Sequence, residues 1–193
     1  MPQSQAIERH PLPPFLPKDA KLLMLGSFPP PQKRWSMEFY YPNLNNDMWR
    51  VMGLIFFGDK NYFVDTAHKT FRKEQIIDFL TAKGIALFDT ATVVRRLKDN
   101  AADQFLEIVE ATDICALLQQ LHKCKAIAVT GQKAMDTLRS QLQVEEPLVG
   151  KSTEFTVEKQ SMRLFRMPST SRAYPLPLER KAAMYETMLK MIN

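Results

Sequence analysis

Polar residues that could do chemistry gather in three segments, each placed after a short apolar run. Ser27 follows LLMLG, Asp89 ends IALFD, and Ser169 and Thr170 follow MRLFRM. Hydroxyls and backbone amides in loops suit anionic oxygens, whereas a carboxylate accepts hydrogen bonds and donates one only when protonated. Each residue also has a plain structural explanation, since Gly26 can turn the chain and the others can cap turns. They form a candidate site only if the fold brings the three segments together.

The order of strands and helices predicts that it does. Apolar runs at 22–26, 85–89 and 125–131 indicate buried strands. One amphipathic stretch indicates a helix that starts near residue 45. Other such stretches indicate helices over residues 72–83, 113–122 and 131–142. Alternating strands and helices predict a parallel sheet with helices on both faces, because each crossover must travel back over the sheet. The carboxyl ends of such strands meet in one crevice.

The remaining segments complete a single domain over 21–193. Five prolines in residues 1–20 predict an extended arm that wraps the domain. The stretch 90–103 is basic and is expected to be an irregular loop. Residues 154–167 favour a hairpin, and apolar residues spaced by four and three predict a last helix from Leu178 to Ile192.

Composition narrows the class of protein. The 193 residues are 45% hydrophobic and 24% charged with 6 glycines, which excludes a disordered, collagen-like or repeat protein. No run approaches the roughly 20 apolar residues of a membrane span, the first residues lack the pattern of a secretory signal, and we expect a cytoplasmic location. Cys115 and Cys124 are too few for a disulfide framework or a four-thiolate metal site. The net charge of +5 favours a polyanionic partner.

Four motifs in this order resemble the uracil-DNA glycosylase superfamily, and most closely its branches that cut mismatched uracil or hypoxanthine. They are GSFP at Gly26, YPNLNNDMW at 41–49, ALFD ending at Asp89, and MPSTS at 167–171. The resemblance spans roughly residues 20 to 190. It implies a three-layer α/β/α fold with a short central, mainly parallel, four-stranded sheet.

The resemblance also implies a reaction and residue roles. Such enzymes flip a nucleotide out of DNA, hold its base in a pocket and hydrolyse the bond between base and sugar. Tyr41 falls where the family places the aromatic that stacks on the base, and Asp89 falls where uracil-specific members read the pyrimidine edge with Asn. The residues expected to bind the base are Gly26, Ser27, Phe28, Tyr41, Asp89 and Met167.

Two positions depart from the family pattern. Most members place Asp or Asn two residues after the motif glycine, where it positions the attacking water, and this chain has Phe28. Many members have histidine in the last motif, and this chain has Met167. In the hypoxanthine branch the catalytic asparagine matches Asn46, so the resemblance makes Asn46 and Asp89 the catalytic residues. The alternative for Asn46 is a helix N-cap.

Asp89 bears on the choice of base. An ionised carboxylate cannot donate a hydrogen bond and repels a departing base anion unless it is protonated or meets a ring N–H. It therefore fits a deaminated purine better than simple uracil specificity. The histidines His10, His68 and His122 lie in the arm, a loop and a helix, and none is expected near a motif.

Two segments are expected to contact DNA. The basic segment after Asp89 follows the family's DNA-facing segment, and the last motif forms the loop that grips the backbone and inserts into the groove. The residues expected there are Arg95, Arg96, Lys98, Ser169, Thr170, Ser171 and Arg172.

The sequence thus predicts a monofunctional base-excision repair glycosylase that removes uracil or hypoxanthine from DNA, with DNA as partner. We expect no cofactor, no metal, no membrane contact and a monomer. One alternative is a member of the same superfamily that binds damaged or single-stranded DNA without cutting. Another is an unrelated α/β enzyme for a nucleotide or small ligand.

Overall fold

A computed structural model describes residues 6–98 and 102–193 of the chain. Its centre is a five-stranded sheet in the order β5-β2-β8-β10-β9. Neighbouring strands are parallel except for β9, which runs antiparallel to β10 at one edge. The strands are β2 (Leu22–Gly26), β5 (Ile85–Asp89), β8 (Ala126–Thr130), β9 (Lys151–Val157) and β10 (Gln160–Met167). The predicted mixed α/β class with a central sheet is confirmed. The predicted number of four strands was wrong, because the hairpin adds β9 to the sheet as a fifth strand.

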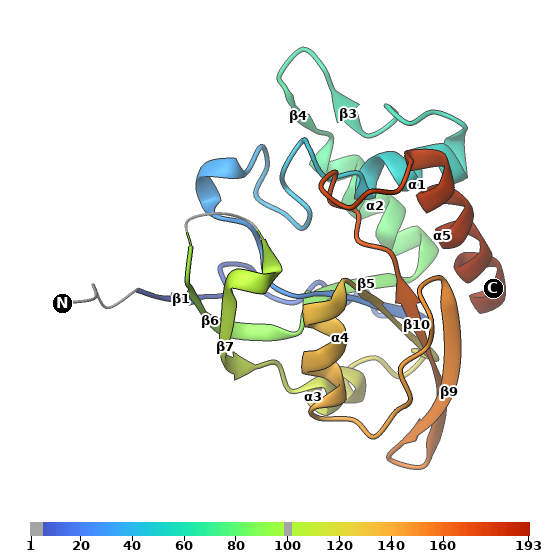
Figure 1. The fold of residues 1–193 in the computed structure, drawn as a ribbon. Helices are drawn as coiled ribbons and strands as arrows, with labels where there is room; N and C mark the ends of the chain where they lie inside the picture. The colour runs from blue at the N-terminus through green and yellow to red at the C-terminus, as the bar shows by residue number, and fades with distance from the viewer. Residues whose placement is uncertain (1–5, 99–101) are drawn as a thin grey trace.

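Helices cover both faces of this sheet (Figure 1). On one face lie α1 (Met48–Phe57), α2 (Lys73–Lys83) and α5 (Leu178–Ile192), with α1 packed on α5. The short helices α3 (Ile114–Gln119) and α4 (Gln132–Arg139) lie on the other face. Every residue of β2, β5 and β8 is buried between them, which explains why these strands appear in the sequence as continuous apolar runs.

Two helices stop at the glycines that follow them. Gly58 and Gly84 have φ values of 65° and 69°, in the left-handed region where a side chain is strained. A small hairpin of β3 (Val64–Asp65) and β4 (Thr70–Phe71) separates α1 from α2. None of the helices in the described ranges is long and apolar enough to span a bilayer.

A second sheet occupies the region expected to be an irregular loop. It consists of β1 (Ile7–Arg9), β6 (Ala91–Arg96) and β7 (Leu106–Ala111), all antiparallel, on the left of Figure 1. The loop prediction was therefore wrong over 91–96. The reason lies in the apolar residues among the charges, since Ala91 and Val94 are buried against Phe28 and Leu106. The short 3-10 helices at Gln32–Arg34 and Asp103–Phe105 lie in connecting segments.

The N-terminal segment runs along this edge of the molecule in extended form. Its β1 pairs with β6, and further along Phe15 pairs with Leu87 of β5 in an isolated antiparallel bridge. The Tyr40 hydroxyl donates to the Pro13 carbonyl at 2.8 Å. Residues 1–5 of the predicted arm lie outside the described residues. These contacts bring the intervening residue, His10, against the end of β5.

Candidate active-site pocket

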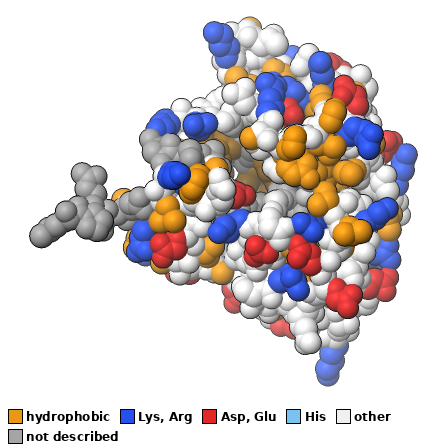
Figure 2. Space-filling view, viewed as in Figure 1, with side chains coloured by type: hydrophobic (Ala, Val, Ile, Leu, Met, Phe, Trp, Pro, Cys, Tyr) orange, Lys and Arg blue, Asp and Glu red, His pale blue; other side chains and the backbone are white. Residues whose placement is uncertain are grey.

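A pocket of about 880 Å³ lies where the parallel strands end. We call it the strand-end pocket. Figure 2 shows a hollow on this face, with hydrophobic side chains visible inside it. The three polar segments named from the sequence meet there, contributing Ser27, Asp89 and Ser169. The expected residues that line it are Gly26, Ser27, Phe28, Tyr41, Asn46, Asp89, Ser169, Thr170, Ser171 and Arg172.

A histidine from the N-terminal segment holds the carboxylate at the floor of the pocket. His10 Nε2 lies 2.7 Å from Asp89 Oδ2, and the side chains are only 4% and 10% exposed. The expectation that no histidine lies near a motif was wrong, because β1 pairing carries His10 across 79 residues of sequence. Its ring packs against Phe28 and Phe88, with ring centroids 5.3 and 4.7 Å away. No local pattern marks such a residue.

Two protonation states of His10 satisfy the contacts. Nδ1 lies 2.9 Å from the Leu12 carbonyl oxygen and 3.1 Å from the Leu12 amide nitrogen. A neutral ring can accept the Leu12 N–H at Nδ1 and donate from Nε2 to Asp89. An imidazolium donates from both nitrogens, to the Leu12 carbonyl and to Asp89. Asp89 Oδ2 is therefore an acceptor in either state.

Gly26 makes room for this carboxylate. A Cβ built on Gly26 would lie 2.6 Å from Asp89 Oδ1, so any side chain there would displace it. Oδ1 accepts no hydrogen bond from the residues that the structure describes, whereas Oδ2 is held by His10. The Asp89 side chain thus keeps one oxygen available on the pocket side.

A second carboxylate, Asp103, reaches the pocket from the segment before β7. The Ser27 hydroxyl donates to Asp103 Oδ1 at 2.7 Å. Burial raises the pKa of Asp103, the Ser27 hydrogen bond opposes this shift, and the nearby Asp89 carboxylate adds to it. The sequence reasoning missed this residue as a site candidate because it was grouped with a basic loop. The only sequence signal was an acidic residue 14 positions after Asp89, the end of β5, and such a signal is too weak to single out Asp103 as a site residue.

Tyr41 forms an aromatic wall of the pocket in a strained conformation. Its φ is 51°, a left-handed value that costs a residue with a side chain about 1–3 kcal/mol. Its ring meets Trp49 edge to face at 5.9 Å. Burial and then the Asp89 carboxylate raise the pKa of Tyr41, so its phenol stays protonated at neutral pH. Strain of this kind is common at binding sites, where the fold must fix one side chain against its local preference.

Phe28 and Met167, the two departures from the family pattern, lie differently. Phe28 is 9% exposed, lines the strand-end pocket and packs into the second sheet's core. Met167 is 2% exposed, belongs to the main core and does not line the pocket. Its expected contact with a base is therefore not part of this site, because the last residue of β10 faces inward.

Asn46 has a structural task as well as a place in the pocket. Its Oδ1 accepts the Met48 N–H at 2.9 Å at the start of α1, and its backbone pairs with Ser171. The helix begins three residues after the position expected from the sequence, with Asp47 as its N-cap residue. Asn46 is therefore not the N-cap residue, but its amide oxygen accepts the first N–H of the helix, whereas its amide nitrogen donates to none of the described residues.

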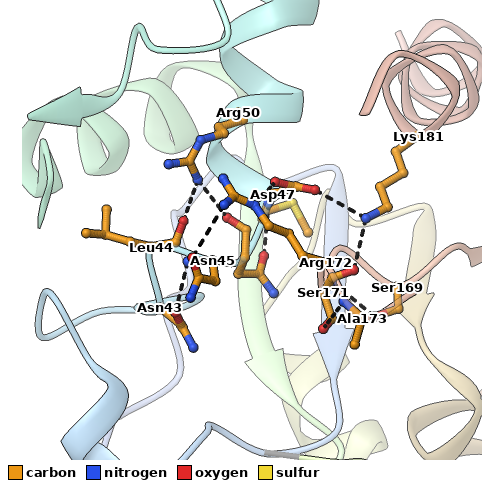
Figure 3. Close-up of polar contacts among 12 residues, drawn as sticks. Asn43, Leu44, Asn45, Asp47, Arg50, Ser169, Ser171, Arg172, Ala173 and Lys181 are labelled. Atoms are coloured by element: carbon orange, nitrogen blue, oxygen red, sulfur yellow. Dashed lines mark hydrogen bonds and ion pairs between the residues drawn. The ribbon is translucent and has the colours of Figure 1, made fainter. Parts of the chain in front are cut away.

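The loop of the last motif is tied to both helices beside it (Figure 3). The Asp47 N–H donates to the Thr170 carbonyl at 2.8 Å, and Lys181 Nζ donates to the Ser171 carbonyl at 2.9 Å. Ser169 and Ser171 each accept the backbone N–H two residues ahead at 3.2 Å, as serine turns do. Thr170 is 2% exposed, which leaves little of it for a partner.

The basic residues expected beyond Asp89 lie in or next to the second sheet and not in the pocket. Arg96 is 9% exposed and pairs through Nε with Glu8 at 3.0 Å, while its Nη2 donates to the Pro29 carbonyl. Arg95 pairs with Glu107 at 2.9 Å, and Lys98 Nζ lies 3.9 Å from the Phe105 ring centroid. Arg96 therefore has a structural role, because pairing of the N-terminal segment with β6 buries its guanidinium group.

Metal-binding geometry is absent from the described ranges 6–98 and 102–193, where no three His, Cys, Asp or Glu side chains are grouped to hold an ion. Within the same ranges Cys115 and Cys124 are free thiols. The titratable groups that line the pocket include the carboxylates of Asp89 and Asp103 and the phenol of Tyr41, and His10 contacts Asp89.

Comparison with known proteins bears on the fold. No family model matches the chain, and no curated protein matches it. One similar solved structure is a solution NMR structure from Methanosarcina acetivorans, named provisionally as a uracil DNA glycosylase. The match has a TM-score of 0.65 and 22% identity, and it covers 97% of this chain and 99% of that one. The two chains share one fold. The likeness extends over nearly the whole of both chains.

Proposed function

We propose that the chain is a DNA glycosylase that hydrolyses the N-glycosidic bond of a deaminated base turned out of the DNA strand. The observation that carries the proposal is the convergence of Tyr41, Asp89, Asp103 and Ser27 in one pocket at the strand ends. An everted base needs a flat face to stack on and polar groups at its edge, and this pocket offers both. The name of the Methanosarcina acetivorans structure agrees with this reaction.

The floor of the pocket can bind a deaminated base through its ring N–H. The free oxygen of Asp89 can accept a ring N–H, which hypoxanthine and uracil both offer next to a carbonyl. The pocket volume of about 880 Å³ accommodates the larger purine. The contact of His10 Nε2 with Asp89 Oδ2 holds this carboxylate in place beneath the base. Both bases meet these conditions, and we rank hypoxanthine ahead of uracil because its two fused rings offer a larger face for stacking on Tyr41.

Asp103 takes the place of the water-positioning acid that the first motif lacks. Hydrolysis breaks the C1′–N bond, whose electron pair leaves on the base, and a water oxygen bonds to C1′ of the sugar. Asp103 accepts a proton from that water and releases it to solvent, and the departing base takes up a proton from solvent, so the net reaction consumes one water. The Ser27 hydrogen bond fixes the orientation of the carboxylate, and the pKa raised by burial makes it a stronger proton acceptor.

Binding of damaged DNA without base release is the second candidate function. It is favoured by Asn46, whose amide oxygen accepts the first N–H of α1, and by Phe28, which packs into the second core and stands where the family usually has Asp or Asn. In this case the pocket would bind the damaged base, but Asn46 would not contribute to cleavage of the glycosidic bond. The two candidates differ in one observable, the release of free base.

The test is a panel of duplex and single-stranded oligonucleotides that carry uracil, hypoxanthine or the normal bases. After incubation with the protein, alkali breaks the strand at each abasic site, and the products are separated by size. We expect breaks at hypoxanthine, fewer at uracil and none in undamaged DNA. Tight binding to a lesion without breaks would support the second candidate, and no preference for any lesion would refute both.

A further inference from the structure

A second hollow of about 550 Å³ lies beside the strand-end pocket and shares Arg172 with it. We call it the basic pocket. Its cations come from separate elements: Arg50 from α1, Lys60 from the turn after α1, Arg172 from the last-motif loop and Lys181 from α5. Asp47 is its single acid. Four positive side chains against one carboxylate leave an excess of three positive charges in one small space.

Asp47 is already engaged by two of these cations. Arg172 Nε donates to Asp47 Oδ1 at 3.2 Å, and Lys181 Nζ donates to Oδ2 at 3.3 Å (Figure 3). Lys181 is 1% exposed and forms the floor of the basic pocket. Arg50 feels the charge of Asp47, but neither Arg50 nor Lys60 forms an ion pair with a residue that the structure describes.

Arg50 is fixed in place with donors to spare. Its Nη1 donates to the Leu44 carbonyl at 2.6 Å and to the Asn46 carbonyl at 3.2 Å, while the guanidinium lies 5.6 Å from the Phe71 ring centroid. Nε and Nη2 donate to none of the residues that the structure describes. Burial and then the positive charge of Arg172 lower the pKa of Arg50, as expected where cations crowd. An anion in the basic pocket would relieve this repulsion.

We propose that Arg50, Lys60 and Arg172 bind a phosphate of the DNA strand whose nucleotide occupies the strand-end pocket. A rigid guanidinium fork beside a flexible ammonium is the usual arrangement for a phosphate group. The position fits because Arg172 borders both hollows, so a strand with one nucleotide turned into the first presents a neighbouring phosphate to the second. This inference rests on the proposed function and adds to it the contact that holds the backbone.

The experiment measures DNA affinity as a function of salt for the wild-type protein, Lys60→Gln and Arg50→Gln. The probe is a labelled oligonucleotide carrying 2′-fluoro-2′-deoxyinosine, whose glycosidic bond resists cleavage, and affinity is read from fluorescence anisotropy. Lys60 is exposed and makes no contact on which folding depends, so Lys60→Gln stays informative if Arg50→Gln fails to fold. The matched control is Lys159→Gln, the same charge change in the distant turn between β9 and β10.

We expect Lys60→Gln and Arg50→Gln to weaken binding about tenfold each, as loss of a charge-assisted hydrogen bond does. The slope of log affinity against log salt is negative, and its magnitude should decrease by about 0.9 for duplex DNA, because one phosphate fewer is neutralised. Lys159→Gln should leave both values unchanged. Equal effects in all three variants, or none in Lys60→Gln, would overturn the proposal.

Neutral methylphosphonate links then locate the phosphate. At one position near the lesion, the neutral link should weaken wild-type binding at least tenfold and should weaken Lys60→Gln binding by a smaller factor, since one of the three cationic contacts is already lost. If instead inorganic phosphate raises the melting temperature of the wild type but not of Lys60→Gln, and no link position matters, the site holds free phosphate and the DNA contact is refuted. These readouts do not depend on base release, so they remain decisive if the proposed function fails.

Discussion

Asp89 and Asp103 share one pocket, but different neighbours prepare them for different tasks. Asp89 is held by the ring nitrogen of His10, which can neutralise its charge, whereas Asp103 is held by the neutral hydroxyl of Ser27. A carboxylate with a basic partner is suited to reading a base, and one with a raised pKa is suited to accepting a proton. In the proposed reaction, these environments make Asp89 the residue that reads the base and Asp103 the proton acceptor.

The substitution Asp103→Asn tests the second role. Asn keeps an oxygen that accepts from Ser27 and removes the proton acceptor, so base release should fall about 10²–10⁴-fold. DNA affinity should change little, because the amide has the same shape. Single-turnover base release and anisotropy measure the two quantities, and an unchanged rate would remove Asp103 from the mechanism.

The same substitution should stabilise the fold at neutral pH. Because burial raises the pKa of Asp103, the folded protein binds a proton more tightly than the unfolded chain. Stability therefore falls as pH rises from the unfolded pKa to the folded one, and the wild type carries this loss at neutral pH. We expect a higher melting temperature for Asp103→Asn at pH 7 and a smaller difference in acid. A variant less stable at pH 7 would contradict the assignment.

At His10, two variants separate packing from hydrogen bonding. His10→Ala leaves Asp89 buried without its partner and should cost about 1–3 kcal/mol, with a lower rate of base release. His10→Gln can still donate from its amide to Asp89 and should lose less stability. Thermal unfolding and the rate for hypoxanthine check this order. If both variants lost the same stability and released base at the wild-type rate, His10 would serve only in packing.

Asn46 can be tested for capping and catalysis separately. Asn46→Asp keeps the oxygen that accepts the Met48 N–H, so the cap persists, but it loses the amide donor. Asn46→Ala loses both and should cost about 1 kcal/mol. If the amide acts in catalysis, both variants should release base about 10²-fold more slowly at nearly unchanged DNA affinity. Wild-type activity in Asn46→Asp would leave Asn46 with the helix cap alone.

At the scale of elements, α5 holds the last-motif loop through a buried lysine. Lys181→Met removes the donor to the Ser171 carbonyl and one partner of Asp47, and it should cost about 3 kcal/mol, since breaking a buried pair leaves a charge uncompensated. The exposed Lys190 on the same helix is the control, and Lys190→Met should cost less than about 0.5 kcal/mol. Chemical denaturation gives both values. Similar costs for the two variants would show that the lysine tie contributes little.

The elements also show how far the sequence reaches. The buried strands, the hairpin, the last helix and the stop at Gly84 follow from apolar periodicity and glycine placement, which are local signals. The segment with Arg95 and Arg96 was misjudged because its charges hide an alternation that makes a strand. The pairing of Ile7–Arg9 with that strand could not be predicted, since it depends on two segments remote in sequence. The pocket residues at strand ends were predictable by topology, whereas His10 was not.

Across the whole molecule, two cores of unequal size predict unequal local stability. The main core packs the central sheet between helices, while the second consists mainly of Phe28, Ala91, Val94 and Leu106. Amides of β8 should exchange hydrogen only on global unfolding, and those of β1 and β7 should exchange through local opening at lower free energy. Native-state hydrogen exchange with mass spectrometry measures this, and equal protection of both sheets would contradict it.

The pairing of β1 with β6 has a consequence for synthesis on the ribosome. The arm is synthesised before the strand that it meets, because Asp89, the partner of its histidine, follows 79 residues later. At roughly 5–20 residues per second, the arm waits about 4–16 seconds before its docking strand exists. During synthesis this segment must therefore stay unpaired until β6 has been made. Its proline-rich composition favours this, because prolines lack the amide N–H that pairing with a wrong strand would need.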